Sequence, residues 1–186
     1  VRETLPPKHP YAKVVVTPAG QIQPQTWLLG SSGQSAAWAG EQGMDYAYAQ
    51  FFTGRQDTGI MDHYRAHLSD GFPGRTLSAV CVSAAPTRQE ALEQSLMAAN
   101  FRVSLGTGRP VTFVTASQMD AETRSLLTSY VLSNEDTIFV GDYDEVADKL
   151  TAFQDAHHVD ELMLISYIDN VQTKVERYRQ LAKRLI

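Results

Sequence analysis

Thr26-Trp27-Leu28-Leu29-Gly30-Ser31-Ser32-Gly33-Gln34-Ser35-Ala36-Ala37-Trp38-Ala39 is the stretch that decides the fold of this chain. Its first four residues are β-branched, aromatic and aliphatic, which is typical of a strand covered on both faces. Gly30 and Gly33 then free the backbone for a tight turn. Small residues follow and favour a helix that packs closely. The stretch therefore predicts a buried strand, a glycine–serine turn and a helix.

The turn has the composition of an anion-binding site. The first N–H groups of a helix are unpaired and carry a partial positive charge, which attracts an anion such as a phosphate. The hydroxyls of Ser31, Ser32 and Ser35 lie in the same place. Ser32 is equally suited to be an ordinary N-cap, and local chemistry alone leaves both interpretations open.

Further strands and helices alternate along the chain, with no repeat and no low-complexity segment. The alternation predicts an α/β fold with parallel strands in a single domain, residues 1–186. The remaining core strands are expected at Asp45–Phe52, Thr76–Ala84 and Leu162–Ser166, with short strands at Lys13–Thr17 and Val111–Val114. The main helices are expected at Ile60–Leu68, from Thr87 to Asn100, at Asp120–Leu132, Asp144–His157 and Thr173–Leu185. Residues 101–138 interrupt the rhythm as an irregular excursion.

Three motifs in a fixed order resemble the luciferase-like flavin-dependent monooxygenases, the family named after bacterial luciferase. They are Trp27-Leu28-Leu29-Gly30-Ser31-Ser32-Gly33-Gln34-Ser35-Ala36 running into Gly43-Met44-Asp45-Tyr46-Ala47-Tyr48-Ala49-Gln50-Phe51-Phe52, then Phe139-Val140-Gly141 with Glu145-Val146-Ala147-Asp148-Lys149-Leu150, and finally Val159-Asp160-Glu161-Leu162-Met163-Leu164-Ile165. Each motif is loose alone, but their order and spacing over nearly the whole chain are specific.

The resemblance implies a parallel (β/α) barrel of the TIM type, of which this chain carries only the fifth to eighth βα units. A complete barrel needs roughly 250 residues, and the chain has 186. A partial barrel leaves strand edges and an apolar inner face uncovered. We therefore expect the chain to form a homo-oligomer or to pair with a missing N-terminal half, unless the excursion and residues 13–17 cap the open edges.

The resemblance also implies a function, a flavin-dependent monooxygenase or oxidoreductase that uses reduced FMN and oxygen on a small organic substrate. A deazaflavin is the second choice of cofactor. The family cradles the cofactor phosphate at positions that match Gly30, Ser31, Ser32, Gly33, Gln34 and Ser35, and its ring lies near the positions of Tyr48, Ala49 and Gln50. Catalytic residues come from the first half of the family barrel and cannot be assigned here. The alternative is a non-catalytic flavin- or phosphate-binding relative, or a purely structural half-barrel.

Alternation in the strand Asp45–Phe52 places Tyr46, Tyr48 and Gln50 on one face. Such a face can line the barrel and contact a flat ring. The same tyrosines can equally be plain core residues, because aromatic side chains usually are. The sequence does not decide between these interpretations.

The other chemistry-bearing residues favour no further site. His63 and His67 share a helix face at i, i+4, but no third metal ligand is evident, so a solvated face is favoured and no metal is expected. Cys81 is the single cysteine of the sequence and is expected to be a buried, inert thiol. A chain with one cysteine forms no internal disulfide, which suits a reducing compartment and a cytoplasmic protein. The net charge of −5 and the lack of a basic cluster argue against a nucleic-acid partner. No run of 18 apolar residues suggests a membrane span.

Overall fold

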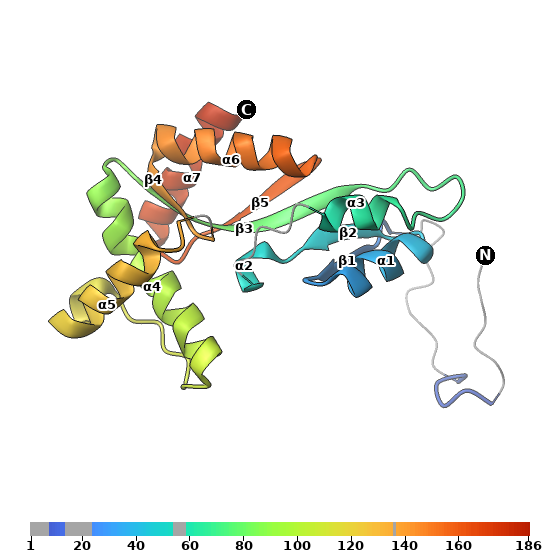
Figure 1. Cartoon of the computed structure of the whole chain (residues 1–186), viewed down its shortest axis with the longest axis horizontal. Helices are drawn as coiled ribbons and strands as arrows, with labels where there is room; N and C mark the ends of the chain where they lie inside the picture. Colours follow the sequence, from blue (N-terminus) through green and yellow to red (C-terminus); the bar gives the residue numbers. More distant parts are fainter. Residues whose placement is uncertain (1–7, 14–23, 54–58, 136) are drawn as a thin grey trace.

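The fold is described by a computed structural model that covers residues 8–13, 24–53, 59–135 and 137–186 (Figure 1). Five parallel strands alternate with helices in these residues. The strands are β1 (Trp27–Gly30), β2 (Asp45–Tyr48), β3 (Thr76–Ala85), β4 (Phe139–Asp142) and β5 (Glu161–Ile165). The helices are α1 (Gly33–Glu41), α2 (Gln50–Thr53), α3 (Ile60–Arg65), α4 (Arg88–Thr107), the 3-10 turn η1 (Ala116–Gln118), α5 (Ala121–Leu132), α6 (Tyr143–His157) and α7 (Val171–Leu185). The predicted α/β class with parallel strands is confirmed.

Strand β3 is the centre of the sheet. Its first residues pair with β2, which in turn pairs with β1. Residues Leu77–Cys81 pair with β5, and residues Val82–Ala85 pair with β4. No strand is predicted at Phe139 from the sequence, because the short apolar run before Gly141 is interpreted as the lead into a helix. Four core strands were therefore expected, and β4 makes a fifth.

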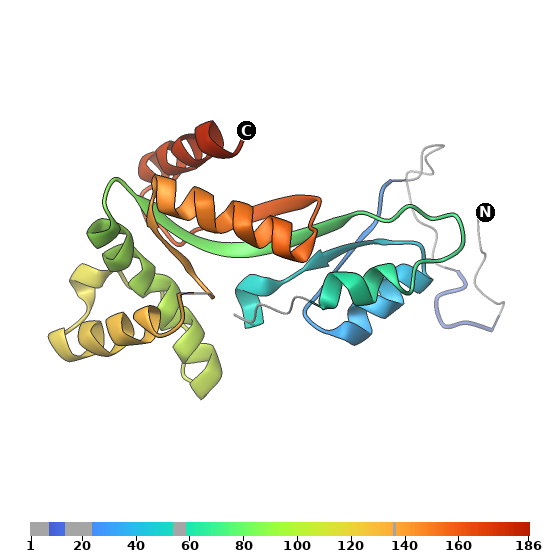
Figure 2. The same ribbon diagram turned by 45° about the horizontal axis from the view of Figure 1, so that its top comes forward.

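One face of the sheet is covered by helices. Directly paired residues of parallel strands point to the same side, so Leu28 and Tyr46 share this face. Helices α1 and α3 pack over its first half, and α6 and α7 pack over its second half (Figure 2). The buried residues of these two clusters are Ala36, Ala39, Tyr46, Tyr48, Ile60, Met61, Tyr64, Val159, Val80, Val82, Ala84, Phe139, Val146, Leu150, Phe153 and Leu181.

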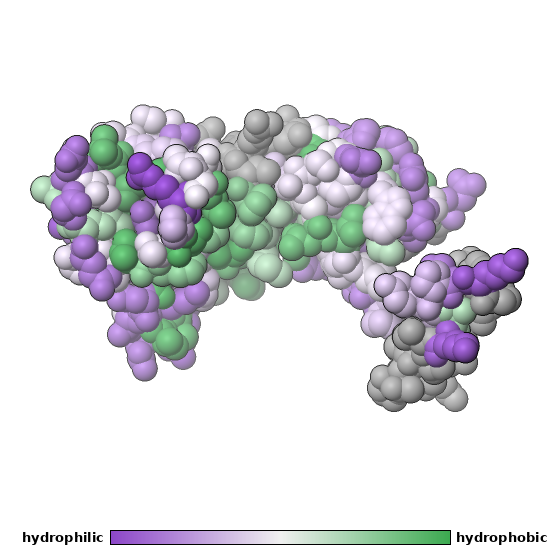
Figure 3. Space-filling model, turned by 90° about the horizontal axis from the view of Figure 1, so that it is seen from below, coloured by the Kyte–Doolittle hydropathy of each residue, from purple (hydrophilic) through white to green (hydrophobic). Residues whose placement is uncertain are grey.

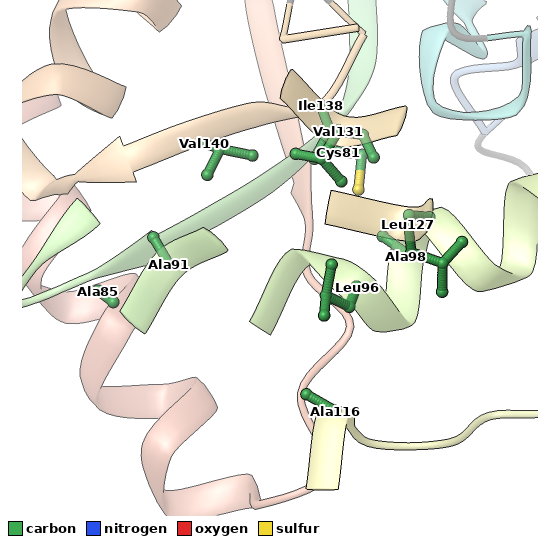
Figure 4. Close-up of a cluster of buried hydrophobic side chains, with 11 residues drawn as sticks. Cys81, Ala85, Ala91, Leu96, Ala98, Ala116, Leu127, Val131, Ile138 and Val140 are labelled. Carbon is green, nitrogen blue, oxygen red and sulfur yellow. The ribbon is translucent and has the colours of Figure 1, made fainter. Parts of the chain in front are cut away.

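The opposite face is only half covered. Helices α4 and α5 pack against Cys81 and Ala85 in the second half of β3, where they form a compact apolar cluster (Figure 4). Over the first half of the sheet, Leu29 is 60% exposed and Met163 is 53% exposed. Seen from below, apolar residues form a band across the middle of the molecule (Figure 3). The sheet thus shows the bare inner face that is expected of an incomplete barrel.

The segment 101–138 is more regular than the sequence predicted. Helix α4 continues through it to Thr107 and ends at Gly108, whose φ of 68° is the left-handed conformation that glycine adopts easily. Gly106 is tolerated inside the helix. The short strand predicted at Val111–Val114 is wrong, because these residues form no strand. The strand predicted at Lys13–Thr17 lies outside the described residues except for Lys13, which is in a turn.

Helix α1 is held very close to α3. A methyl group on Gly40 would lie 2.7 Å from the carbonyl oxygen of His67 and 3.0 Å from that of Tyr64. The Tyr64 hydroxyl also donates to the carbonyl oxygen of Met44 at 2.9 Å. Burial is the main cause that raises the pKa of Tyr64 to about 12, so this donor stays protonated. The contact therefore needs glycine at position 40.

We predict that Gly40→Ala destabilises the chain by about 1–3 kcal/mol, the usual cost of overpacking. Gly106→Ala is the matched control, because it also lies in a helix but a methyl group there meets nothing within 4 Å. That control should gain up to about 1 kcal/mol from helix propensity. Urea unfolding measures both variants. Equal stability of the two would contradict the close packing of α1 on α3.

Candidate functional site

The turn between β1 and α1 has the geometry that the sequence predicts. Ser32 is the N-cap of α1, with extended backbone at φ −138° and ψ 157°. The backbone N–H of Ser35 donates to the Ser32 hydroxyl at 3.3 Å, and the Ser35 hydroxyl donates to the Ser32 carbonyl at 2.7 Å. Ser32 is therefore a true cap, and this role leaves the first N–H groups of the helix for other partners.

A second interaction fixes the shape of the turn. A methyl group on Gly30 would lie 2.1 Å from the Ser35 hydroxyl oxygen and 2.5 Å from its Cβ, so only glycine fits there. The Tyr46 and Ser35 hydroxyl oxygens lie 3.2 Å apart, within hydrogen-bonding distance. Ala49, just beyond β2, donates its N–H to the Gly30 carbonyl at 2.8 Å. The end of β2 is thereby tied to the turn.

The electrostatics of the turn suit an anion. Helix α1 has no acidic residue in its first turn. Among the described residues, the N–H groups of Gly33 and Gln34 have no hydrogen-bonding partner, and Ser31, Ser32 and Gln34 are exposed. The helix dipole adds a partial positive charge at the same place. Unpaired donors and a partial positive charge are the features that attract an anion such as a phosphate.

His63 is a neighbour of the turn that sequence reasoning did not assign to it. Its ring lies against Gly33, so that a methyl group there would be 3.4 Å from Cδ2 and 3.6 Å from Nε2. The spacing to His67 was read only as a possible metal pair, and the two rings lie 4.4 Å apart. Nothing in the sequence between residues 33 and 63 signals this long-range contact. Across the described residues, no group of three or more metal-ligating side chains comes together.

The structure separates the three residues predicted near the cofactor ring. Ala49 lies beside the turn, as just described. The side chain of Tyr48 is 1% exposed and packs with Tyr46 and Tyr64 under α1 and α3. Of the two interpretations left open for Tyr46 and Tyr48, the packing matches a core role. Their place as cofactor contacts stays a prediction.

The predicted strand Asp45–Phe52 is wrong beyond Tyr48, because Gln50 opens helix α2 and shares no strand face with Tyr48. Its side chain lies beside the segment that leads into β4. Its Nε2 donates to the Thr137 carbonyl at 3.2 Å, and Arg102 of α4 donates to the same oxygen at 2.9 Å. Arg102 also donates to the Phe51 carbonyl at 3.0 Å. The Gln50 Oε1 and Arg102 Nη1 atoms are buried without a partner among the described residues. Sequence reasoning missed Arg102, because its contacts join segments 35 and 51 residues apart.

Cys81 is buried at 1% exposure in the cluster between β3, α4 and α5. Burial raises the pKa of its thiol to about 11, and the Arg102 charge offsets this only in part. Its thiolate fraction at neutral pH is therefore very small. The expectation of a buried, unreactive thiol agrees with this environment.

The chain was compared with known proteins by sequence and by structure. No family model matches the chain. The N-acetyl-S-alkylcysteine monooxygenase of Bacillus subtilis is 27% identical over 191 aligned positions, which cover 100% of this chain and 57% of the relative. The crystal structure of apo-MsnO8 superposes with a TM-score of 0.73 at 30% identity, over 91% of this chain and 53% of that one. The resemblance to the luciferase-like monooxygenases is confirmed.

A more distant structure shares the fold. The oxygenating constituent of 3,6-diketocamphane monooxygenase from Pseudomonas putida, a type II Baeyer-Villiger monooxygenase solved with FMN, superposes with a TM-score of 0.55 at 16% identity. It covers 87% of this chain and 48% of that one, and at this identity it shows the fold alone. The chain spans about half the length of the relatives it matches. Among the described helices, none has the length and apolar character to cross a bilayer.

Proposed function

We propose that this chain is the C-terminal, cofactor-binding portion of a flavin-dependent monooxygenase that uses reduced FMN and oxygen on a small organic substrate. The observation that carries the proposal is the capped turn Gly30–Ser35, open to solvent at the carboxyl end of a parallel strand. Ligands of α/β sheets bind at that edge. The similarity to a curated monooxygenase over the whole chain supports the same activity.

In this proposal the chain's own residues bind and orient the cofactor. The N–H groups of Gly33 and Gln34 donate to the phosphate oxygens, and the Ser31 hydroxyl and the His63 imidazole add donors at the rim. The hydroxyls of Ser32 and Ser35 bond within the turn and hold its shape, so they do not contact the ligand. Reduced FMN supplies the electrons for the reaction with oxygen. The residues that we propose to lie toward the flavin ring are Tyr48, Ala49 and Gln50. A deazaflavin is the second choice of cofactor.

The proposal predicts a charge-specific response at Ser32. Asparagine and aspartate are both good N-caps, so Ser32→Asn and Ser32→Asp keep the helix start and differ only in charge. The aspartate should weaken FMN binding at least tenfold through repulsion of the phosphate, and the asparagine should stay within about threefold of the original chain. Titration by flavin fluorescence quenching measures both. The difference should shrink as salt is added.

Riboflavin, which lacks the phosphate, is the ligand control for this titration. Its affinity should be the same in the two variants. Equal FMN binding by Ser32→Asn and Ser32→Asp would overturn the phosphate site. FMN binding without oxygen-dependent turnover of substrate would instead favour the alternative, a non-catalytic flavin-binding relative.

A second part of the proposal concerns assembly. β1 pairs with β2 on one side, and no described residue pairs with its other edge. Leu29 of β1 and Met163 of β5 are exposed on the face of the sheet that the helices leave bare. We propose that another polypeptide covers it, either a second copy of this chain or an N-terminal half. Such a protein, with its single buried cysteine, suits the reducing cytoplasm.

We predict that the 186-residue chain self-associates and that Leu29→Lys weakens this at least tenfold. Burying a leucine contributes about 1.5–3 kcal/mol, which exceeds the 1.4 kcal/mol of a tenfold change. Leu126→Lys, on α5 and 66% exposed, is the matched control and should have no effect. Light scattering coupled to gel filtration measures the mass. A monodisperse species of 20.6 kDa at micromolar concentration would show that the face is not an interface between copies.

A further inference from the structure

A trough lies beyond the carboxyl end of β5, away from the β1–α1 turn. It runs between α4, η1 and the start of α7. Two adjoining cavities of about 390 and 700 Å³ make it up, and both touch the loop Tyr167–Asp169. Sites for small organic molecules usually measure about 300–1,000 Å³. The trough is therefore of a size to hold one such molecule.

Phe113 and Tyr167 form an aromatic wall of the larger cavity, and the Phe101 ring packs against both. Phe113 lies with its ring centroid 6.0 Å from that of Tyr167 and 5.7 Å from that of Phe101. Phe101 and Tyr167 also contact each other at 5.4 Å. Although it is stacked, Phe113 is 62% exposed, so part of its ring remains open.

The backbone next to Phe113 is anchored, although it belongs to no helix or strand. Asn100 of α4 donates to the Thr112 carbonyl at 2.9 Å, one residue before the aromatic ring. Past the ring, the Thr115 and Ser117 hydroxyls bond each other at 2.9 Å and begin η1. The hydrogen bond from Asn100 thus ties the backbone beside the ring to α4.

The charges around the trough are largely compensated. Arg177 is 8% exposed, and its guanidinium donates to the Ala84 carbonyl and to Gln94 and pairs with Glu90 at 3.7 Å. Asp169 and Lys174, of opposite charge, both line the larger cavity. Burial raises the pKa of the Tyr167 hydroxyl, which therefore stays neutral. Such a lining favours a ligand without charge.

We propose that this trough binds the organic substrate of the monooxygenase through an uncharged, planar apolar group that stacks on Phe113. The inference rests on the proposed function, because it names the substrate class of that enzyme. It also follows from position, since the trough and the phosphate cradle lie beyond the carboxyl ends of strands in one parallel sheet, where substrate and cofactor meet. Met97, Ile165 and Ile168 supply the remaining apolar lining.

The trough and the turn are separate enough to be tested independently. Gly30 lies level with Leu162 across β1, β2, β3 and β5, which is three strand spacings away. Ile165 lies three residues farther along β5. At about 4.8 Å per strand and 3.3 Å per residue, the two sites are on the order of 15–20 Å apart. A change at one site should therefore leave the other intact.

The test uses the full 186-residue chain and 2-naphthol, a neutral fluorescent aromatic probe, without flavin. Phe113→Ala should weaken binding at least tenfold. The matched control is Phe52→Ala, because Phe52 is 58% exposed but lies in α2, outside the trough. Thr115→Trp, which fills the cavity, should also abolish binding, and circular dichroism checks that each variant is folded. An equal loss in Phe52→Ala and Phe113→Ala, or full binding by Thr115→Trp, overturns the proposal.

Two further measurements test the charge of the ligand and distinguish failure of the trough from failure of the phosphate site. 2-Naphthalenesulfonate, which has the same ring system with a negative charge, should bind at least tenfold more weakly than 2-naphthol, and tighter binding overturns the preference for an uncharged ligand. Ser32→Asp should bind 2-naphthol as the original chain does. Loss of FMN binding with intact naphthol binding thus reports only on the cradle, while the reverse result reports only on the trough.

Discussion

The hydrogen bonding of β3 is the constraint on which the rest of the structure depends. This ten-residue strand, buried except at Leu77, is the one strand that pairs with three others among the described residues. Its first half joins β2 and β5, and its second half joins β4. Without it, no described pairing would connect the part that carries the β1–α1 turn to the part that carries α4, α5 and the trough. Both proposed ligand sites owe their relative position to this strand.

The two halves of β3 have different surroundings, and the difference has a functional consequence. The second half is covered on both faces, by α6 and α7 on one side and by α4 and α5 on the other. Around the first half, helices cover one face and leave Leu29 and Met163 exposed on the other. The proposed phosphate cradle lies on this half-covered part. A partner that covers the bare face would also enclose the space beside the cradle, where exclusion of water favours flavin chemistry.

The sequence predicts the local features well, because each depends on neighbours along the chain. The capped turn follows from glycine and serine spacing, and the buried Cys81 follows from an apolar strand. Helix α4 ends at Gly108 because glycine adopts the left-handed conformation easily. The predicted end of this helix was too early, because Gly106 suggested a loop. The strand β4 was missed because four residues carry too weak a pattern.

Features that depend on distant contacts were beyond the sequence. Alternation placed Tyr46 and Tyr48 on one face but could not tell which face the helices cover. The contact of His63 with Gly33 and the shared carbonyl of Gln50 and Arg102 join segments that only the folded sheet brings together. The same holds for the aromatic wall of Phe113 and Tyr167. These residues belong to the candidate sites through tertiary structure alone.

Nuclear magnetic resonance of the ¹⁵N-labelled chain, titrated separately with FMN, inorganic phosphate and riboflavin, tests the central claim most directly. The account predicts that the backbone amides of Gly33 and Gln34 shift strongly with FMN and with phosphate, and little with riboflavin. FMN binding that leaves these two amides in place, while amides elsewhere shift, would contradict it.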